Sequence, residues 1–163
     1  MAYEFDLGEL EGPLADQTDG NAWVVEFILG FDADTDELNV MSVLLFETDE
    51  NNKLELCFGI RTKSGPELDV VSLPDYSKEK TDFCIPKDNR MEVTIRLREA
   101  IELLISDADP EYIIMQTFYP NLEPKALRKY DAVEDTLSTS GYLPQDSWRE
   151  PDGINYWLFK KQG

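Results

Sequence analysis

The first part of the chain carries three hydrophobic stretches, each about the length of a strand. Residues 23–30 and 54–60 show the period of two that places alternate side chains on opposite faces of a strand, and residues 38–46 form a third strand-like stretch. Two short polar segments, 32–37 and 47–53, separate the three stretches and are typical of turns. Sequential strands with such short connections predict an antiparallel meander.

The second half of the chain changes to a helical period. After Asn89, apolar residues recur at the spacing of a helix face, which predicts a helix that stops at 107–110. The segment 121–141 predicts a second helix, with Asn121 as its cap and Gly141 at its end. The expected buried faces are Val93, Leu97, Ala100, Ile101 and Leu104 in the first helix, and Ala126, Tyr130, Val133 and Leu137 in the second.

Between the two predicted helices, residues 112–120 form an almost unbroken apolar run. A run of this length, rich in β-branched and aromatic residues, predicts a central strand covered on both faces of the sheet. Residues 154–161 predict a last strand, and the connection within 112–160 is long enough for a parallel crossover. Residues 68–73 could add a fourth strand to the meander.

Together these elements predict an α+β fold. An N-terminal antiparallel β-meander is followed by helix, strand, helix and strand, which gives a mixed sheet with two main helices. We divide the chain into an acidic, loosely ordered arm at 1–22 and a single α+β domain at 23–163. The order of elements resembles that of compact acyltransferase-like folds. At 163 residues, the chain is long enough to bury a core without a metal or a disulfide.

Membrane insertion and export are not indicated by the sequence. No segment approaches the ~18 apolar residues of a membrane span, and the N-terminus has neither a basic nor an apolar region. Cys57 and Cys84 are too few for a disulfide framework, which favours reduced thiols and a cytoplasmic location. Each is expected to be a small apolar core residue. No pattern indicates the oligomeric state.

Residue types exclude several classes of reaction. The chain has no histidine, so Ser-His-Asp and Cys-His nucleophile arrangements are excluded. Asp32, Asp34 and Asp36 match the opening of a calcium loop, but Glu37 and Val43 stand where that loop needs a glycine and a glutamate. A solvated hairpin turn is the simpler interpretation. No catalytic, cofactor-binding or metal-ligating residue is predicted.

A coenzyme A site would be expected to contain a glycine-rich turn whose amides hold the phosphates. No two glycines of this chain are two residues apart. A strongly anionic chain would also repel a polyanionic cofactor unless a local basic patch intervened. The candidate patch, Lys125, Arg128 and Lys129, is more simply explained as a solvated helix face. No cofactor is predicted, and direct nucleic-acid binding is disfavoured because phosphate affinity comes from Lys and Arg.

The formal charge of −19 is unevenly distributed. Residues 1–55 hold 15 acids and one base, whereas residues 56–163 hold 19 acids and 14 bases. Such a field steers association with a basic partner. The leading hypothesis is a non-enzymatic acidic interaction protein that binds a basic surface on a protein partner, as an inhibitor, an immunity-type protein or a nucleic-acid (DNA) mimic. Its expected partner-binding residues are Asp32, Asp34, Asp36, Glu37, Glu47, Asp49 and Glu50.

Two alternatives stay open at this point. One is a divergent acyltransferase-like enzyme whose site the sequence does not locate. The other is an acidic domain whose charge serves only solubility or adaptation to salt. The uneven charge and the nine lysines against six arginines count against the second alternative.

Overall fold

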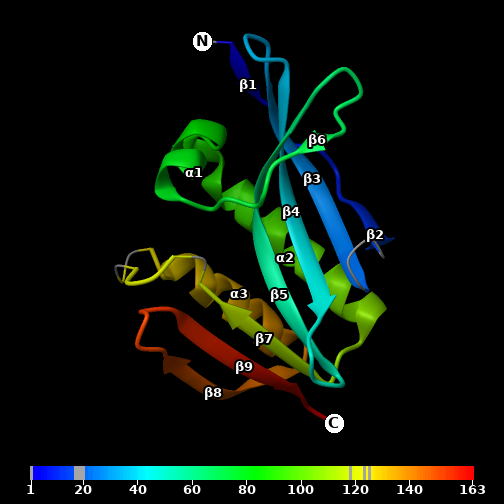
Figure 1. The fold of residues 1–163 in the computed structure, drawn as a ribbon, viewed down its shortest axis with the longest axis vertical. Coiled ribbons are helices and arrows are strands. Elements are labelled where there is room, and N and C mark those ends of the chain that lie inside the picture. The colour runs from blue at the N-terminus through cyan, green and yellow to red at the C-terminus, as the bar shows by residue number, and fades with distance from the viewer. Residues whose placement is uncertain (1, 17–20, 118, 123, 125) are drawn as a thin grey trace.

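The computed structural model describes residues 2–16, 21–117, 119–122, 124 and 126–163. Over these residues the chain forms nine strands in one mixed sheet, three α-helices and one short 3-10 helix. The strand order is β1-β3-β4-β5-β7-β9-β8, with β2 beside β3 and β6 beside β5 (Figure 1). This arrangement confirms the predicted α+β class with a mixed sheet.

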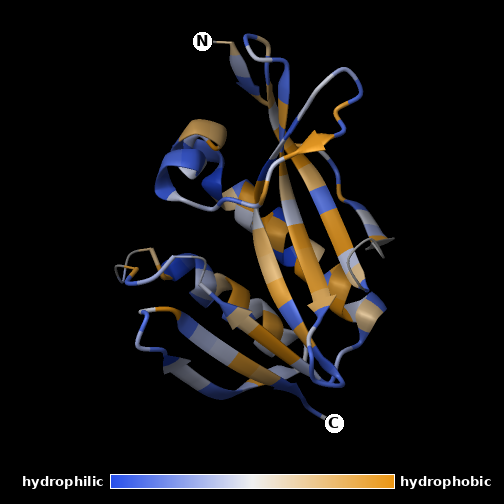
Figure 2. Cartoon of the chain, viewed as in Figure 1, coloured by the Kyte–Doolittle hydropathy of each residue, from blue (hydrophilic) through white to orange (hydrophobic). Residues whose placement is uncertain are grey.

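The predicted meander forms the centre of the sheet. It consists of β3 (Ala22–Asp32), β4 (Glu37–Glu47) and β5 (Lys53–Ser64), paired antiparallel in sequence order. Hydrophobic residues concentrate along these strands and on the helix behind them (Figure 2). Alternate positions are buried on one face of the sheet: Val25, Phe27 and Leu29 in β3, Met41, Val43 and Leu45 in β4, and Leu56, Phe58 and Ile60 in β5.

The segment that the sequence assigns to an arm contributes two strands at the edge of the sheet. β1 (Tyr3–Phe5) and β2 (Glu11–Asp16) both pair antiparallel with β3. The Tyr3 hydroxyl donates to the carbonyl oxygen of Cys84 at 2.7 Å, which ties this edge to the middle of the chain. Residues 17–20 of the arm lie outside the described residues, and the loose order of the arm stays a prediction.

Both long helices pack on the same face of the sheet. α2 (Arg90–Ala108) lies behind β3 and β4, and α3 (Arg128–Thr139) lies beside it (Figure 1). The predicted helix faces are buried, apart from Ala126, which precedes α3 and is exposed. Because both stripes join one hydrophobic cluster, the two long helices cover the same face of the sheet within the part of the chain that the structure describes.

The expectation that the central strand is covered on both faces is wrong. β7 (Tyr112–Gln116) buries Ile113 and Met115 under the helices, whereas Ile114 on the other face is only half-buried. The strand is also shorter than the apolar run, and Phe118 of that run lies outside the described residues. An unbroken apolar run therefore does not establish that both faces are covered.

The parallel pair of the sheet is β5 and β7, joined through α2. β9 (Asn155–Lys161) runs antiparallel to β7, so the predicted crossover at 112–160 is wrong. An unpredicted edge strand, β8 (Tyr142–Arg149), follows α3 and reverses the chain before β9. Its sequence gives little strand signal because all its residues except Tyr142 are exposed and it contains Pro144, both common on edge strands.

Short elements fill the connection between β5 and α2. They are β6 (Val70–Val71), which is all that forms of the possible strand at 68–73, α1 (Lys78–Cys84) and a 3-10 helix at Lys87–Asn89. α1 is not predicted from the sequence because it has seven residues and buries only Cys84, so it has no apolar stripe. Among the described residues, no helix is both long and apolar enough to cross a membrane.

Candidate active site

β5 and β7 stay paired over only four positions. Their parallel register runs from Lys53 beside Tyr112 to Leu56 beside Met115. Beyond this point β7 ends at Gln116, while β5 continues and pairs with β6 instead. The two strands therefore diverge, with α1 on one side of the divergence and the start of α3 on the other (Figure 1).

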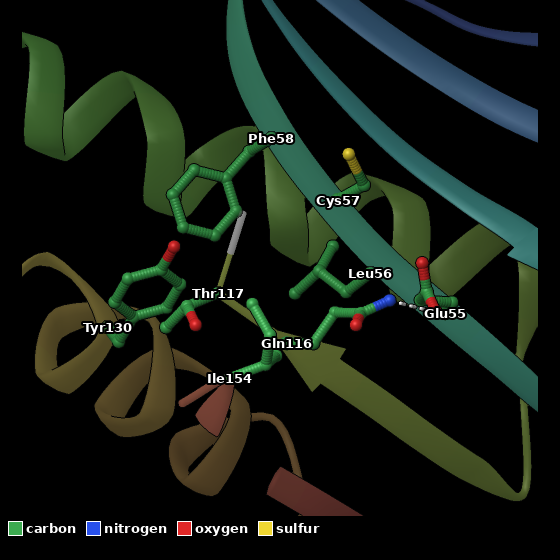
Figure 3. A pocket seen from close by; sticks show the side chains of 8 residues that line it. All are labelled: Glu55, Leu56, Cys57, Phe58, Gln116, Thr117, Tyr130 and Ile154. Atoms are coloured by element: carbon green, nitrogen blue, oxygen red, sulfur yellow. Dashed lines mark hydrogen bonds between the residues drawn. The ribbon is translucent and has the colours of Figure 1, made fainter. Parts of the chain in front are cut away.

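A cavity of about 190 Å³ lies where the strands diverge. Phe58 of β5 and Tyr130 of α3 face each other in it, with ring centroids 5.6 Å apart (Figure 3). Glu55 and Gln116 lie on the side of the open sheet face, where Gln116 Nε2 donates to Glu55 Oε1 at 3.1 Å. The remaining lining residues are Leu56, Cys57, Thr117 and Ile154.

Among the described residues that line this cavity, Glu55 carries the one carboxyl group. Burial raises its pKa, and the hydrogen bond from Gln116 opposes this increase in part. A carboxylate with a raised pKa is a stronger proton acceptor than an ordinary glutamate, which suits a general base. The neighbouring Cys57 differs, because burial raises the pKa of its thiol to about 12 and keeps it protonated. Cys57 is therefore not a thiolate nucleophile.

Tyr130 is held rigidly at the helix side of the cavity. Its side chain is buried, and its ring stacks on Trp157 with centroids 5.2 Å apart and an angle of 14° between the planes. The phenol hydroxyl can donate as well as accept a proton. The cavity thus brings a carboxyl group and a phenol to a single opening between two strands.

A second, larger cleft lies between α1, the first turn of α2 and the start of α3, with a volume of about 590 Å³. Apolar side chains such as Ile85 and Val93 line part of it. Among the described residues that line it, cations outnumber the one carboxylate, Asp82, although the chain as a whole carries a charge of −19. The cationic residues are Lys78, Lys87, Arg90 and Lys129.

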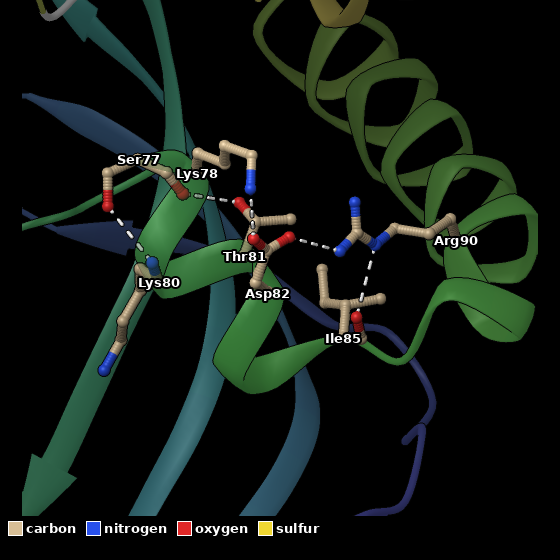
Figure 4. Close-up of polar contacts among 7 residues, drawn as sticks. All are labelled: Ser77, Lys78, Lys80, Thr81, Asp82, Ile85 and Arg90. Atoms are coloured by element: carbon tan, nitrogen blue, oxygen red, sulfur yellow. Dashed lines mark hydrogen bonds and ion pairs between the residues drawn. The ribbon is translucent and has the colours of Figure 1, made fainter.

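Asp82 organises two of these cations. It accepts from Lys78 Nζ at 2.7 Å and from Arg90 Nη2 at 2.9 Å (Figure 4). The hydrogen bond from Lys78, followed by that from Arg90, lowers the pKa of the Asp82 carboxyl. Arg90 Nε also donates to the carbonyl oxygen of Ile85 at 3.2 Å, which fixes the guanidinium at the start of α2.

Lys129 is half-buried at the boundary between the two clefts. Its ammonium donates to the carbonyl oxygen of Tyr76 at 2.7 Å and lies 4.2 Å from the centre of the Tyr76 ring. Burial lowers the pKa of Lys129 to about 8. Tyr76 in turn packs edge-on against Phe58, with centroids 5.5 Å apart. The cation-lined cleft and the cavity beside Tyr130 therefore adjoin.

The seven predicted partner-binding acids do not converge on one surface. Asp32, Asp34, Asp36 and Glu37 lie at the β3–β4 turn, and Glu47, Asp49 and Glu50 lie at the β4–β5 turn. These turns are at opposite ends of the eleven-residue β4, roughly 33 Å apart at about 3.3 Å per residue. Among the described residues, no group of His, Cys, Asp or Glu is placed to hold a metal ion.

The sequence alone did not indicate that most of the residues lining the two clefts belong to a site. Within the candidate basic patch, Lys129 lines the cleft, Arg128 is exposed, and Lys125 lies outside the described residues. Lys78, Lys87 and Arg90 are distant from Lys129 along the chain, so counting local charge does not reveal their cluster. Glu55 carries no motif, and Tyr130 resembles an ordinary core position of a helix.

No family model and no curated protein matches the sequence. Among solved structures, the chain is similar to ribosomal-protein-S5-alanine acetyltransferase from Vibrio fischeri, with 10% identity and a TM-score of 0.39 over 85% of this chain and 61% of that one. It is also similar to two chimeras of spermidine N-acetyltransferase SpeG from Vibrio cholerae and hSSAT. Both are 12% identical and cover 85% of this chain and 66% of those chains, with TM-scores of 0.38 and 0.36.

The leading hypothesis from the sequence, a non-enzymatic acidic interaction protein with an inhibitor or DNA mimic role, is not retained. The similar solved structures carry acetyltransferase names, and the seven acids expected to bind a partner lie at opposite ends of β4 rather than on one surface. The neighbours do not define a substrate for this chain, which spans less than two thirds of each. The predicted basic protein partner is untested by any contact in the structure.

Proposed function

We propose that the chain is an acyltransferase that moves an acyl group from a phosphate-bearing thioester, such as acetyl-coenzyme A, to an amine. The observation that carries this proposal is the cation-lined cleft adjoining the cavity between β5 and β7. A polyanionic donor meets a local positive field there, in spite of the overall charge of the chain. The local basic patch that such a donor requires is assembled from four separate elements, which are α1, the 3-10 helix, α2 and α3.

The lining of the cleft fits phosphate groups through its side chains. Lys87, Arg90 and Lys78 would bind phosphate oxygens by charge-assisted hydrogen bonds. The amides in the first turn of α2 add partial positive charge. These contacts take the place of the glycine-rich turn, which the sequence lacks. Ile85 and Val93 would cover the apolar part of the donor.

The cavity supplies the groups that acyl transfer to an amine requires. A bound thioester supplies the activated acyl group. The C–N bond forms as the C–S bond breaks, the amine proton passes to the Glu55 carboxylate, and the Tyr130 hydroxyl protonates the departing thiolate. Phe58 and Tyr130 keep water away from the helix side of the cavity.

Donor binding is testable with coenzyme A alone. We expect coenzyme A to raise the Tm of the wild-type chain, because a ligand that binds only the folded state stabilises it. Lys87→Gln is expected to weaken binding about 10- to 100-fold, since charge-assisted hydrogen bonds contribute about 1.5–3 kcal/mol. Lys53→Gln is the matched control, because Lys53 pairs with Glu50 at the far end of β5.

Acyl transfer is then measured as free thiol released from acetyl-coenzyme A in the presence of a panel of amines. Binding of coenzyme A without release of thiol would leave an anion-binding protein, and the absence of both would contradict the proposal.

We also propose a cytoplasmic location. Both Cys57 and Cys84 are free thiols, as a reducing compartment would keep them, which supports this location.

A further inference from the structure

A row of four side chains crosses the open face of the sheet and ends at the candidate active site. Trp148 of β8 lies opposite Tyr156 of β9, which lies opposite Gln116 of β7. Residues directly opposite on neighbouring strands point to the same face. Gln116 donates to Glu55 of β5, which completes the row. Within the described part of the chain, this face is the one that α2 and α3 leave uncovered.

The outer half of this row is a preformed aromatic surface. The rings of Trp148 and Tyr156 stack with centroids 5.4 Å apart and an angle of 5° between their planes. Trp148 Nε1 also donates to Glu150 Oε1 at 3.0 Å, which fixes the indole. Trp148 is 36% exposed and Tyr156 is half-buried, so both rings are accessible although their positions are set.

Three carboxylates lie near Tyr156 of this aromatic pair. Burial, followed by the negative charges of Asp152, Glu150 and Glu55, raises the pKa of the Tyr156 phenol, which places all three acids near it. Neighbouring cations are engaged elsewhere. Arg149 donates to Asn121, and Lys160 lies over the Tyr112 ring four residues further along β9.

We propose that Trp148, Tyr156 and Glu150 bind the cationic end of an elongated diamine whose other amine lies at Glu55. Ring faces attract alkylammonium groups, and nearby carboxylates strengthen that attraction. Glu55 and Tyr156 lie two strands apart, about 10 Å at ~4.8 Å per strand, so the ligand spans that distance. Its role as the acyl acceptor rests on the proposed function, whereas its binding does not.

Binding is measured without any acyl donor, by NMR of the tryptophan indole N–H groups. The Trp148 signal is assigned by its disappearance in Trp148→Phe. We expect diaminooctane to shift this signal with a millimolar Kd and to leave the Trp23 signal in place. Neutral octanediol, of similar length, is expected to cause no shift. Equal shifts with octanediol, or no shift with diaminooctane, would overturn the proposal.

Two further comparisons separate the contributions of ring, charge and length. Glu150→Gln should weaken diaminooctane binding about 3- to 10-fold, whereas Tyr156→Phe, which keeps the ring, should stay within about 2-fold. Octylamine, with a single charge, should bind more weakly than diaminooctane in the wild type and equally in Glu55→Gln. Equal affinity of octylamine and diaminooctane for the wild type would contradict the two-ended site. Melting curves of each variant show that the fold is kept.

The outcomes for donor and diamine are independent. Diamine binding together with failure of coenzyme A to raise the Tm would keep the cation site and remove its role as the acceptor site. Coenzyme A binding without a diamine-dependent shift would keep the proposed function and refute this inference.

Discussion

Glu55 is the residue on which the proposed chemistry depends. It sits where β5 leaves β7, so its carboxyl group is partly desolvated, while Gln116 keeps it oriented. The same environment that makes it a stronger base also disfavours its charged form in the folded state. The partial burial that suits Glu55 to act as a base therefore lowers the stability of the folded state when the carboxyl group is ionised.

We expect Glu55→Gln to lower kcat/KM for acyl transfer by about 10²- to 10³-fold and to leave the Tm increase by coenzyme A unchanged. A base acts when ionised, so the wild-type rate should rise with pH through a limb above the ordinary glutamate pKa of 4.5. The variant should lack this limb. An unchanged rate, or a limb that persists in the variant, would show that Glu55 is not the proton acceptor.

The lowered pKa of Lys129 predicts a pH dependence of folding stability that can be measured without an activity assay. Its folded-state pKa of about 8 lies below the ordinary value of 10.5, so between these values the unfolded chain binds more protons. Stability contributed at this position should therefore rise as pH increases from about 8 to about 10.5. Relative to Lys129→Met, the wild-type Tm should gain about 2–4 °C over this range. Parallel melting profiles of the two proteins would contradict the lowered pKa.

At the scale of elements, α1 forms one side of the cationic cleft, so the cleft depends on the position of this helix. The helix has only seven residues, and its start is fixed by the Ser77 hydroxyl, which accepts from the Lys80 amide at 3.2 Å. A helix this short has little stability of its own. Its position depends on this cap and on the ion pairs of Asp82 with Lys78 and Arg90.

Ser77→Ala should therefore cost about 1 kcal/mol, or roughly 2–4 °C in Tm, and should weaken coenzyme A binding along with it. Ser77→Thr is the matched control, because threonine keeps a hydroxyl acceptor and should restore both quantities. Thermal melts with and without coenzyme A measure the two effects. If Ser77→Ala melts like the wild type, the cap does not hold α1.

At the scale of the whole molecule, the chain has 34 acidic and 15 basic residues, and four of the basic residues line one cleft. A chain of −19 repels itself in the folded state, and dissolved salt screens that repulsion. The cationic cleft provides a local exception, assembled from α1, the 3-10 helix, α2 and α3. Salt should therefore act in opposite directions on folding and on donor binding.

We expect the Tm of the ligand-free chain to rise by several degrees between about 0.02 and 0.5 M NaCl, because screening relieves self-repulsion. Over the same range, the affinity for coenzyme A should fall, since its contacts are ionic. Both quantities come from melting curves at several ligand concentrations. A Tm that falls with salt would mean that the ion pairs outweigh the repulsion.

Periodicity along the chain was sufficient to predict the meander, the two long helices and the α+β class. These features follow from local alternation, because the spacing of apolar residues reports directly which face of a strand or helix is buried. Elements with little buried surface, such as α1 and β8, escaped prediction for the same reason. Net charge was also readable from the sequence, but its placement was not.

Only the tertiary structure decided the site. The opening exists because β5 pairs with β7 over four positions and then pairs with β6. These pairings join segments that are distant in the sequence. The tertiary structure also brings Lys78, Lys87 and Arg90 together with Lys129 in one cleft. It places Trp148 and Tyr156 in a row with Glu55 on the open face of the sheet. Hydrophobic pattern acts through neighbours in the chain, whereas a site depends on neighbours in space.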